Sequence, residues 1–271
     1  MWAGGKTKVL KHQIPYFPET AETYSEPFFG GGAAFLYASQ RYNLKKVFIN
    51  DVYDGIVNIY TAVQRDIDTF CALVNALQSQ YLPLSKSGRK AFYYGVRHTH
   101  AYHFEQWDKT QEAATLYFLL RTGFNGVLQF NKNCNNRFGT PSGLLNQTDK
   151  VYDEDNVRQW HILLKNAEIS CGNYTECPPA DLNYLDPPYR DSFTTYGTKW
   201  GDAEVESLLD YAKGLKGNVL LCNRCDGTDF FESRKGNLSL VKFPVTYTMG
   251  RKKKTEDGHK AVSATEILLY K

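Results

Sequence analysis

The tetrapeptide Asp186, Pro187, Pro188 and Tyr189 combines groups that could act together on one flat, polar ligand. It follows the apolar run LNYL (182–185), so we expect it at the carboxyl end of a strand, where open α/β sheets bind ligands. Asp186 offers a carboxylate, and the constrained backbone of the prolines can aim a carbonyl, that of Pro187, at the same group. Tyr189 adds a ring face for stacking. A Pro-Pro turn without chemistry is the alternative.

These groups suit the modification of an aromatic amino group such as that of adenine. Because the amino lone pair is delocalised into the ring, the nitrogen reacts only when acceptors hold its protons and help it toward tetrahedral geometry. A base paired inside a duplex cannot reach such a pocket, so the nucleotide must be flipped out. We therefore predict catalytic roles for Asp186, Pro187 and Tyr189.

A second stretch, EPFFGGGA (26–33), lies where a predicted strand turns into a predicted helix. Its glycines let a ligand approach the backbone without meeting a Cβ atom. Asp51 ends the next predicted strand 19 residues after Gly32, close to the spacing of about 20 at which a carboxylate holds the ribose of a nucleoside cofactor. A tight turn beside an unrelated surface Asp is the alternative.

The elements that must position these residues follow an α/β pattern. The strand-like runs TYSEPFF (23–29) and KKVFIND (45–51) flank the helix-like AAFLYASQRY. A helix is predicted around Asp155 to Lys165 and another over 202–215. Five further strand-like segments accompany them: EISCGNY, DLNYLD, GNVLLCN, NLSLVKF and ATEILLY.

Between the two α/β parts lies a block with helical spacing, from Val52 to about Ala114, continued by Thr115 to Leu120. Apolar residues recur three or four positions apart at Ile59, Val63, Ile67, Phe70, Val74 and Leu77. The following stretch, 123–149, is rich in Gly, Asn and Pro and is predicted to be a loop, and a loop of this length is usually either functional or disordered. We interpret the block as a helical insertion.

The composition limits the class of protein. With 271 residues, 42% of them hydrophobic, the chain can bury one core or one core and a smaller domain. No apolar run approaches the roughly 20 residues of a membrane span, and the first residues lack a secretory signal, so we expect a cytoplasmic protein. The charge of +3 permits nucleic-acid binding without requiring it. The six scattered cysteines are expected to be free thiols.

Several motifs occur together in one order: WAGGK (2–6), EPFFGGGAAFL (26–36), FIND (48–51), RTGFNG (121–126), YLDPPY (184–189), FTTY (193–196) and TEILLY (265–270). In this order they resemble the DNA adenine methyltransferase family of bacteria and phages, over nearly the whole chain. The resemblance implies a Rossmann-like core with an inserted helical target-recognition domain, with S-adenosylmethionine as methyl donor and double-stranded DNA as substrate. It also implies the cytoplasm of a bacterial cell or a phage-infected host.

The resemblance carries over residue by residue. Cofactor binding is implied for Trp2, Lys6, Phe28, Gly30, Gly32, Asp51 and Asp186. Asp186 matches the catalytic acid. Phe124 and Asn125 match a pair in the family's recognition hairpin, which would run from Asn125 through Gly143. The core is then expected over residues 1–57 and 150–271, and the target-recognition domain over 58–149 with its hairpin near 123–145.

The hairpin departs from the family pattern at Gln129. Members that modify GATC commonly carry an Arg there, and an Arg suits a bidentate contact to guanine, whereas a Gln suits adenine. Arg137 in the longer hairpin could reach a guanine by another route. We expect DNA contacts from Phe124, Asn125, Gln129 and Arg137, and a target that is relaxed or altered relative to GATC.

Two groups of residues have types that could bind a metal, but neither is predicted to form a metal site. Cys222 and Cys225 form a C-x-x-C without a matching second pair, since Cys171 and Cys177 are too widely spaced. Three histidines, His98, His100 and His103, do not converge on one helical face. No metal is expected. The basic run from Arg251 to Lys254 is equally consistent with a phosphate contact and with a solvated loop.

Three alternatives remain at the level of the sequence. The same fold could act on another amino acceptor, such as RNA adenine, cytosine N4 or a protein amide. A nicotinamide dehydrogenase would explain Gly30 to Gly32 with Asp51, but would leave WAGGK and the Asp-Pro-Pro-Tyr segment without a purpose. A DNA-binding protein that has lost catalysis would be expected to have a broken cofactor loop, which this chain does not have.

Overall fold

The computed structural model describes residues 7–143, 149–190, 200–225, 227–247, 253–255, 258–260 and 262–271. The chain divides into two compact units. One, the helical unit, contains Asp51–Gly172, and the other, the sheet unit, contains the described residues before Asp51 and after Gly172.

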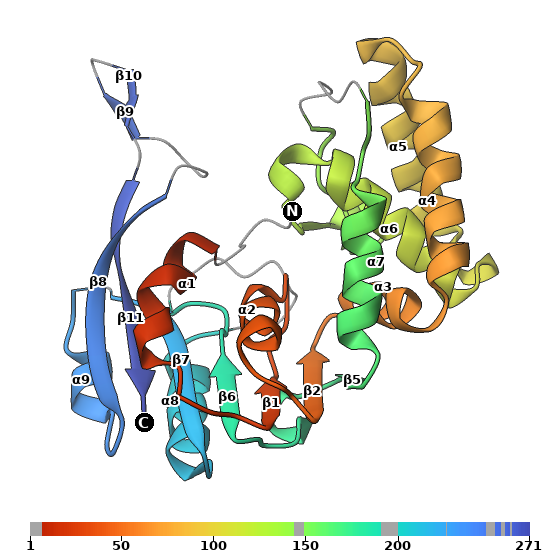
Figure 1. The fold of residues 1–271 in the computed structure, drawn as a ribbon. Coiled ribbons are helices and arrows are strands. Elements are labelled where there is room, and N and C mark those ends of the chain that lie inside the picture. Colours follow the sequence, from red (N-terminus) through yellow and green to blue (C-terminus); the bar gives the residue numbers. More distant parts are fainter. Residues whose placement is uncertain are drawn as a thin grey trace. The chain divides into compact units, whose positions relative to one another are not determined.

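The main sheet has the strand order β5-β2-β1-β6-β7-β11-β8, which confirms the predicted α/β class (Figure 1). Strands β1, β2, β6 and β7 are parallel, whereas β11 pairs antiparallel with both β7 and β8. The bounds are β1 (Thr23–Glu26), β2 (Lys46–Asp51), β5 (Ala167–Cys171), β6 (Leu182–Leu185), β7 (Asn218–Arg224), β8 (Ser239–Tyr247) and β11 (Val262–Tyr270). A separate antiparallel pair consists of β9 (Lys253–Thr255) and β10 (Gly258–Lys260).

The central strands have apolar sequences because their side chains are buried. All four residues of β6 are buried, as are the five central residues of β7. Helix α8 (Asp202–Gly214) packs Val205, Leu208, Leu209 and Ala212 into the same core cluster as Leu185 and Leu221 of the strands. The other helices of this unit are α1 (Thr7–Gln13), η1 (Ile14–Tyr16), α2 (Ala33–Arg41), η5 (Tyr174–Glu176) and α9 (Phe230–Arg234).

A chain of buried polar groups lies inside the sheet unit. The Tyr184 hydroxyl donates to Oε1 of Gln13 at 2.7 Å, and Nε2 of Gln13 donates to Sγ of Cys222 at 3.2 Å. Burial raises the pKa of Tyr184 well above its usual range, so its hydroxyl stays a donor. Cys222 is completely buried and is one of six free cysteines. Its contact with Gln13 gives this thiol a structural role.

The helical unit is built around α6 (Lys109–Thr122), whose buried residues include Leu116, Phe118, Leu119 and Leu120. The predicted helical block begins with α3 (Asp54–Arg65), α4 (Ile67–Tyr81) and α5 (Lys86–Tyr102). Side chains cap three helices: Ser85 accepts from the amide of Gly88, Asp108 from that of Gln111 and Asp153 from that of Asn156. The remaining elements are η2 (Phe104–Gln106), η3 (Phe124–Gly126), β3 (Phe130–Asn131), η4 (Lys132–Cys134), β4 (Arg137–Phe138) and α7 (Glu154–Leu164).

His100 is buried near Trp107, whereas His98 and His103 are exposed. Neither ring nitrogen of His100 has a hydrogen-bond partner among the described residues. Burial, with a smaller contribution from the charge of Arg137, lowers the pKa of His100 to about 3. The imidazole is therefore neutral in the folded protein at neutral pH.

This burial predicts a dependence of stability on pH. Because the pKa of His100 is about 3 when folded and about 6.5 when unfolded, the unfolded chain binds the proton first, and stability falls as the pH drops below about 6.5. His100→Phe should remove this contribution, about 2 kcal/mol between pH 7 and pH 5. Urea unfolding at both pH values measures it, with His98→Phe as the control at an exposed position. An equal pH dependence in the wild type and His100→Phe would contradict the prediction.

Candidate active site and nucleic-acid interface

The segment Asp186–Tyr189 leaves the carboxyl end of β6, as predicted from its position after LNYL. Asp186 and Tyr189 are partly buried, and Pro187 is buried. The hydroxyl of Tyr189 donates to Oε2 of Glu266 at 2.6 Å. A carboxyl group, a carbonyl and an aromatic ring therefore follow one another at the end of a buried strand.

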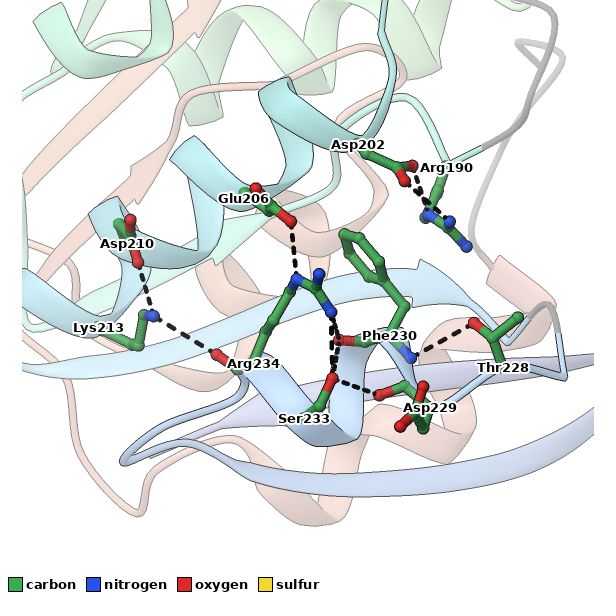
Figure 2. Close-up of polar contacts among 10 residues, drawn as sticks. All are labelled: Arg190, Asp202, Glu206, Asp210, Lys213, Thr228, Asp229, Phe230, Ser233 and Arg234. Atoms are coloured by element: carbon green, nitrogen blue, oxygen red, sulfur yellow. Dashed lines mark hydrogen bonds and ion pairs between the residues drawn. The ribbon is translucent and has the colours of Figure 1, made fainter.

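The residue after this segment, Arg190, is anchored by three elements, and Figure 2 shows its partners on two of them, Asp202 of α8 and Phe230 of α9. Its amide donates to Oδ1 of Asn223 on β7 at 3.2 Å. Its Nε and Nη2 atoms donate to the Asp202 carboxylate at 2.8 and 3.1 Å, at the start of α8. Its guanidinium lies 4.1 Å from the ring centroid of Phe230 on α9. Bidentate pairing of this kind fixes orientation as well as distance.

A second guanidinium completes this arrangement around Phe230. Arg234 lies 4.4 Å from the same ring centroid and donates through Nε to Glu206 at 2.7 Å (Figure 2). Asp202 and Glu206 are four residues apart and therefore lie on one face of α8. The two pairs connect α8 to α9 and to the segment that follows β6.

The glycine-rich segment forms a tight turn between β1 and α2. The amide of Phe29 donates to the carbonyl of Asn50 at 3.0 Å, and that of Gly32 donates to the carbonyl of Phe29 at 2.9 Å. Gly30 and Gly32 have φ values of 47° and 61°, which other residues adopt at a cost. A Cβ atom placed on Gly30 would meet no atom of the described residues within 4 Å. The turn therefore presents open space beside its backbone.

Phe28 belongs to an aromatic cluster next to this turn. Its ring is stacked on Tyr174 with a centroid separation of 5.2 Å and meets Trp200 edge-on at 5.8 Å. Nε1 of Trp200 is buried and has no partner among the described residues. The cluster packs against the core beneath α8, so Phe28 also supports the fold.

A buried acid, Glu26, ends β1 directly before the glycine turn. Its Oε2 atom accepts a hydrogen bond of 2.7 Å from the Tyr24 hydroxyl. Burial, followed by the charge of Glu26, raises the pKa of Tyr24 well above its usual range. Tyr24 and Glu26 therefore form a buried, hydrogen-bonded polar pair at the end of β1.

Asp51 is the last residue of β2, as predicted, and is partly buried. Its Oδ1 atom accepts from the amide of Tyr53 at 3.0 Å. The next residue, Val52, is 54% exposed, which is unusual for an apolar side chain directly after a buried strand. Trp2 and Lys6, the two remaining cofactor residues predicted from the motifs, lie outside the described residues.

In the helical unit, the predicted hairpin follows α6 directly. Strands β3 and β4 pair antiparallel through Phe130 with Phe138, and Gly123 forms a bridge with Ser142. Helix α5 supports the returning chain: the Tyr93 hydroxyl donates to the carbonyl of Thr140 at 2.9 Å, and Arg97 donates to the carbonyls of Gly139 and Thr140, each at 3.0 Å. The hairpin is therefore held from one side by a helix.

The turn at the start of this hairpin exposes the predicted pair. Phe124 is 48% exposed, and Asn125 is exposed with φ of 54°. The amide of Phe124 donates to the carbonyl of Pro141 at 2.8 Å, which fixes the backbone beneath its ring. An exposed aromatic ring and an exposed amide thus stand side by side on a fixed turn.

Gln129 and Arg137 differ in their surroundings. Gln129 is exposed, and its carbonyl accepts from the amide of Gly139 at 2.7 Å. Arg137 donates to the buried Glu112 of α6, and its guanidinium lies 3.2 Å from the ring centroid of Phe104. Arg137 therefore ties β4 to α6, and a contact with a guanine would require it to leave this ion pair.

The geometry agrees with the comparisons to known proteins. A family model described as D12 class N6 adenine-specific DNA methyltransferase matches residues 2–239. The chain belongs to this family. It is 33% identical over 248 residues to the type II methyltransferase M.MjaIII of Methanocaldococcus jannaschii, covering 85% of this chain and 84% of that protein.

Two further relatives are similar over most of their length. The type II methyltransferase M.CviBI of Paramecium bursaria Chlorella virus NC1A is 28% identical, with 84% of this chain and 82% of that protein covered. A DNA adenine methylase of Haemophilus influenzae is 25% identical, with 79% and 73% covered. The protein is thus an N6-adenine DNA methyltransferase, and the predicted family and activity are confirmed over the dehydrogenase alternative.

Within the described part of this methyltransferase, no group of three or more His, Cys, Asp or Glu residues is placed to hold a metal ion. The helices of that same part include none with the length and apolar character needed to cross a bilayer. Cys222 and Cys225 differ in burial, and the amide of Cys225 donates to the carbonyl of Thr265 at 2.8 Å.

The residues that hold the Asp-Pro-Pro-Tyr segment of the methyltransferase in place were not predicted from the sequence. Glu266 lies within the TEILLY motif, and an acid inside an apolar strand was a signal that could have been used. Asn223 interrupts the apolar run of β7 in the same way. The ion pair of Arg190 with Asp202 left no local signal, because its partners are 12 residues apart on different elements.

The hairpin of the methyltransferase depends on a glycine that tolerates no side chain. A Cβ atom on Gly139 would lie 2.2 Å from Cβ of Asn131, so Gly139→Ala should force β3 and β4 apart. We expect a loss of about 1–3 kcal/mol in the free energy of unfolding. Gly95→Ala is the matched control, because a Cβ atom there meets nothing within 4 Å. Urea unfolding compares the two, and equal stabilities would contradict the prediction.

Proposed function

We propose that Asp186 and the carbonyl of Pro187 accept hydrogen bonds from the amino group of a flipped adenine, and that Tyr189 stacks on its ring. One observation carries this proposal: β1 and β6 are parallel neighbours, so the glycine turn and Asp186 leave the same edge of the sheet. A methyl donor at the turn and an acceptor beside Asp186 can therefore meet.

The family implies S-adenosylmethionine as the methyl donor. When bound, it supplies a methyl group on a positively charged sulfur. The turn suits such a ligand, since Gly30 faces open space where a side chain would otherwise stand. We propose that Phe28, Gly30, Gly32 and the Asp186 carboxylate border it, with Asp51 on the ribose hydroxyls. Trp2 and Lys6 complete the set by their match to the family motif.

The residues act by positioning and by placing charge. Asp186 and the Pro187 carbonyl hold the amino protons, so that the nitrogen lone pair turns toward the methyl carbon. With a methyl donor bound, the nitrogen held in this way would take the methyl group, and the electron pair of the broken carbon–sulfur bond would stay on sulfur. The nitrogen then releases one proton, for which the Asp186 carboxylate is the adjacent acceptor. No covalent intermediate with the protein is needed.

We propose that residues 58–149 form the target-recognition domain, which contacts double-stranded DNA through its hairpin. The exposed Phe124 ring and Asn125 amide, on a turn fixed by Pro141, support contact with a duplex from which one base has been flipped. Exposed Gln129 lies further along the hairpin, where it can reach base edges.

We further propose a target relaxed or altered relative to GATC. Gln129 stands where members that modify GATC commonly carry an Arg. Arg137, the alternative source of a guanine contact, is engaged by Glu112 and Phe104, which supports the proposal. A Gln prefers the N6 and N7 atoms of adenine, and one such contact discriminates by about 1–3 kcal/mol.

Asp186→Ala tests the catalytic proposal. We expect transfer of labelled methyl groups to duplex DNA to fall by about 100-fold or more, because the amino group loses its acceptor. The variant should stay folded, and S-adenosylmethionine should raise its melting temperature less than that of the wild type. Asp210→Ala, at an exposed position of α8, is the matched control. Wild-type turnover by Asp186→Ala would refute the assignment.

Gln129→Arg tests the proposal on specificity. We expect the variant to gain preference for guanine at one position, by about 1–3 kcal/mol, because an Arg makes the bidentate contact that guanine favours. Sequencing DNA methylated by each protein, with modified bases identified at single-nucleotide resolution, gives both preferences. Strict and efficient methylation of GATC by the wild type, with near-cognate sites untouched, would show the proposal to be wrong.

A further inference from the structure

A carboxylate lies in the interior of the sheet unit, at a position where an apolar side chain would cost less free energy to bury. Glu266 is completely buried on β11, an inner strand, and the next three residues, Ile267, Leu268 and Leu269, are apolar and buried. Burying an ionised group costs several kcal/mol unless hydrogen bonds compensate. Stability alone does not explain an acid at this position.

The Glu266 carboxylate contacts a residue of the proposed catalytic segment, Tyr189. Oε2 of Glu266 accepts the Tyr189 hydroxyl at 2.6 Å, within the range of short, charge-assisted O–H···O bonds. The hydroxyl of a tyrosine lies on the axis of the Cβ–Cγ bond, so a fixed hydroxyl restricts the Cα–Cβ torsion and with it the direction of the ring's long axis. The hydrogen bond therefore determines where the Tyr189 ring lies.

The adjacent strand fixes the backbone next to the ring. Asn223 on β7 is the register partner of Ile267, the neighbour of Glu266. Its Oδ1 atom accepts from the amides of Arg190, at 3.2 Å, and Arg224, at 2.8 Å. Asn223 is completely buried, and its Nδ2 atom has no partner among the described residues, so only its acceptor is used there. Residues 189 and 190 are thus held by two neighbouring strands.

We propose that Glu266 is a positioning residue for methyl transfer: it holds the ring of Tyr189 in the place from which the ring stacks on the flipped adenine. This inference rests on the proposed role of Tyr189. The acid acts through the tyrosine and does not touch the substrate. Its loss lets the ring leave the stacking orientation, so the step that needs an aligned base slows while cofactor binding is retained.

Four variants separate positioning from stability. Glu266→Gln keeps an acceptor oxygen, Glu266→Leu removes it, and Tyr189→Phe keeps the ring and removes the donor. Tyr189→Phe with Glu266→Leu removes both partners of this hydrogen bond, so its stability shows how much of the loss in Glu266→Leu comes from separating the Tyr189 hydroxyl from its acceptor. Glu168→Leu, the same replacement at an exposed position of β5, is the matched control. Each purified variant is tested for methyl transfer to duplex DNA, for the melting-temperature shift with S-adenosylmethionine and for urea unfolding.

We expect Glu266→Leu to lower kcat by about 10- to 100-fold, since misplacing a group by about 1 Å can cost on the order of 100-fold. Glu266→Gln should recover part of that loss, and the shift with S-adenosylmethionine should match the wild type. The double variant should be as slow as the slower single variant, although its free energy of unfolding is higher than that of Glu266→Leu.

The inference would be overturned if Glu266→Leu had the kcat of the wild type. If Glu266→Leu does not fold, a wild-type kcat in the double variant would overturn it. A double variant that recovers both stability and kcat would also overturn it, because the role of Glu266 would then be structural. These results leave the proposed function intact if Asp186→Ala is inactive. An active Asp186→Ala would instead overturn the proposed function.

Discussion

Two polar side chains inside the sheet unit, Glu266 and Asn223, must form hydrogen bonds because both are completely buried. The segment after β6 supplies the partners, through the hydroxyl of Tyr189 and the amide of Arg190. This requirement fixes the chain beyond the strand that carries Asp186, on which the geometry of the site depends. A loop that would otherwise be free to move is thereby tied to β7 and β11.

The surroundings of Arg190 strengthen this constraint from outside the sheet. Its ion pair with Asp202 and its contact with Phe230 connect the same segment to α8 and α9. Arg190 is largely shielded, with a side-chain exposure of 14%, so the pair is screened less than an open surface contact. The antiparallel end of the sheet thus holds the Asp186–Tyr189 segment, as the parallel part holds the glycine turn.

In the helical unit, the ion pair of Arg137 with Glu112 has a comparable effect. It holds β4 against α6, while Tyr93 and Arg97 of α5 hold the returning chain. Phe124, Asn125 and Gln129 remain exposed on this supported hairpin. The side chains that are exposed to a DNA duplex are therefore different from those that hold the hairpin in place.

The sequence was sufficient for features that depend on neighbouring residues. The apolar run LNYL placed Asp186 at the end of a strand, and the strand-like run KKVFIND placed Asp51 at the end of another. It was insufficient where partners are distant: Tyr189 and Glu266 are 77 residues apart, and Arg137 and Glu112 are 25 residues apart. Such pairs depend on the order of strands and on the return of a hairpin, which periodicity does not encode.

The most direct test is a crystal structure of the methyltransferase bound to S-adenosylhomocysteine and a duplex that contains its target. We expect the target adenine outside the helix, its amino group within hydrogen-bond distance of Asp186 and the Pro187 carbonyl, and its ring parallel to Tyr189, whose hydroxyl still contacts Glu266. An adenine bound away from Asp186, or stacked on a side chain other than Tyr189, would contradict the account.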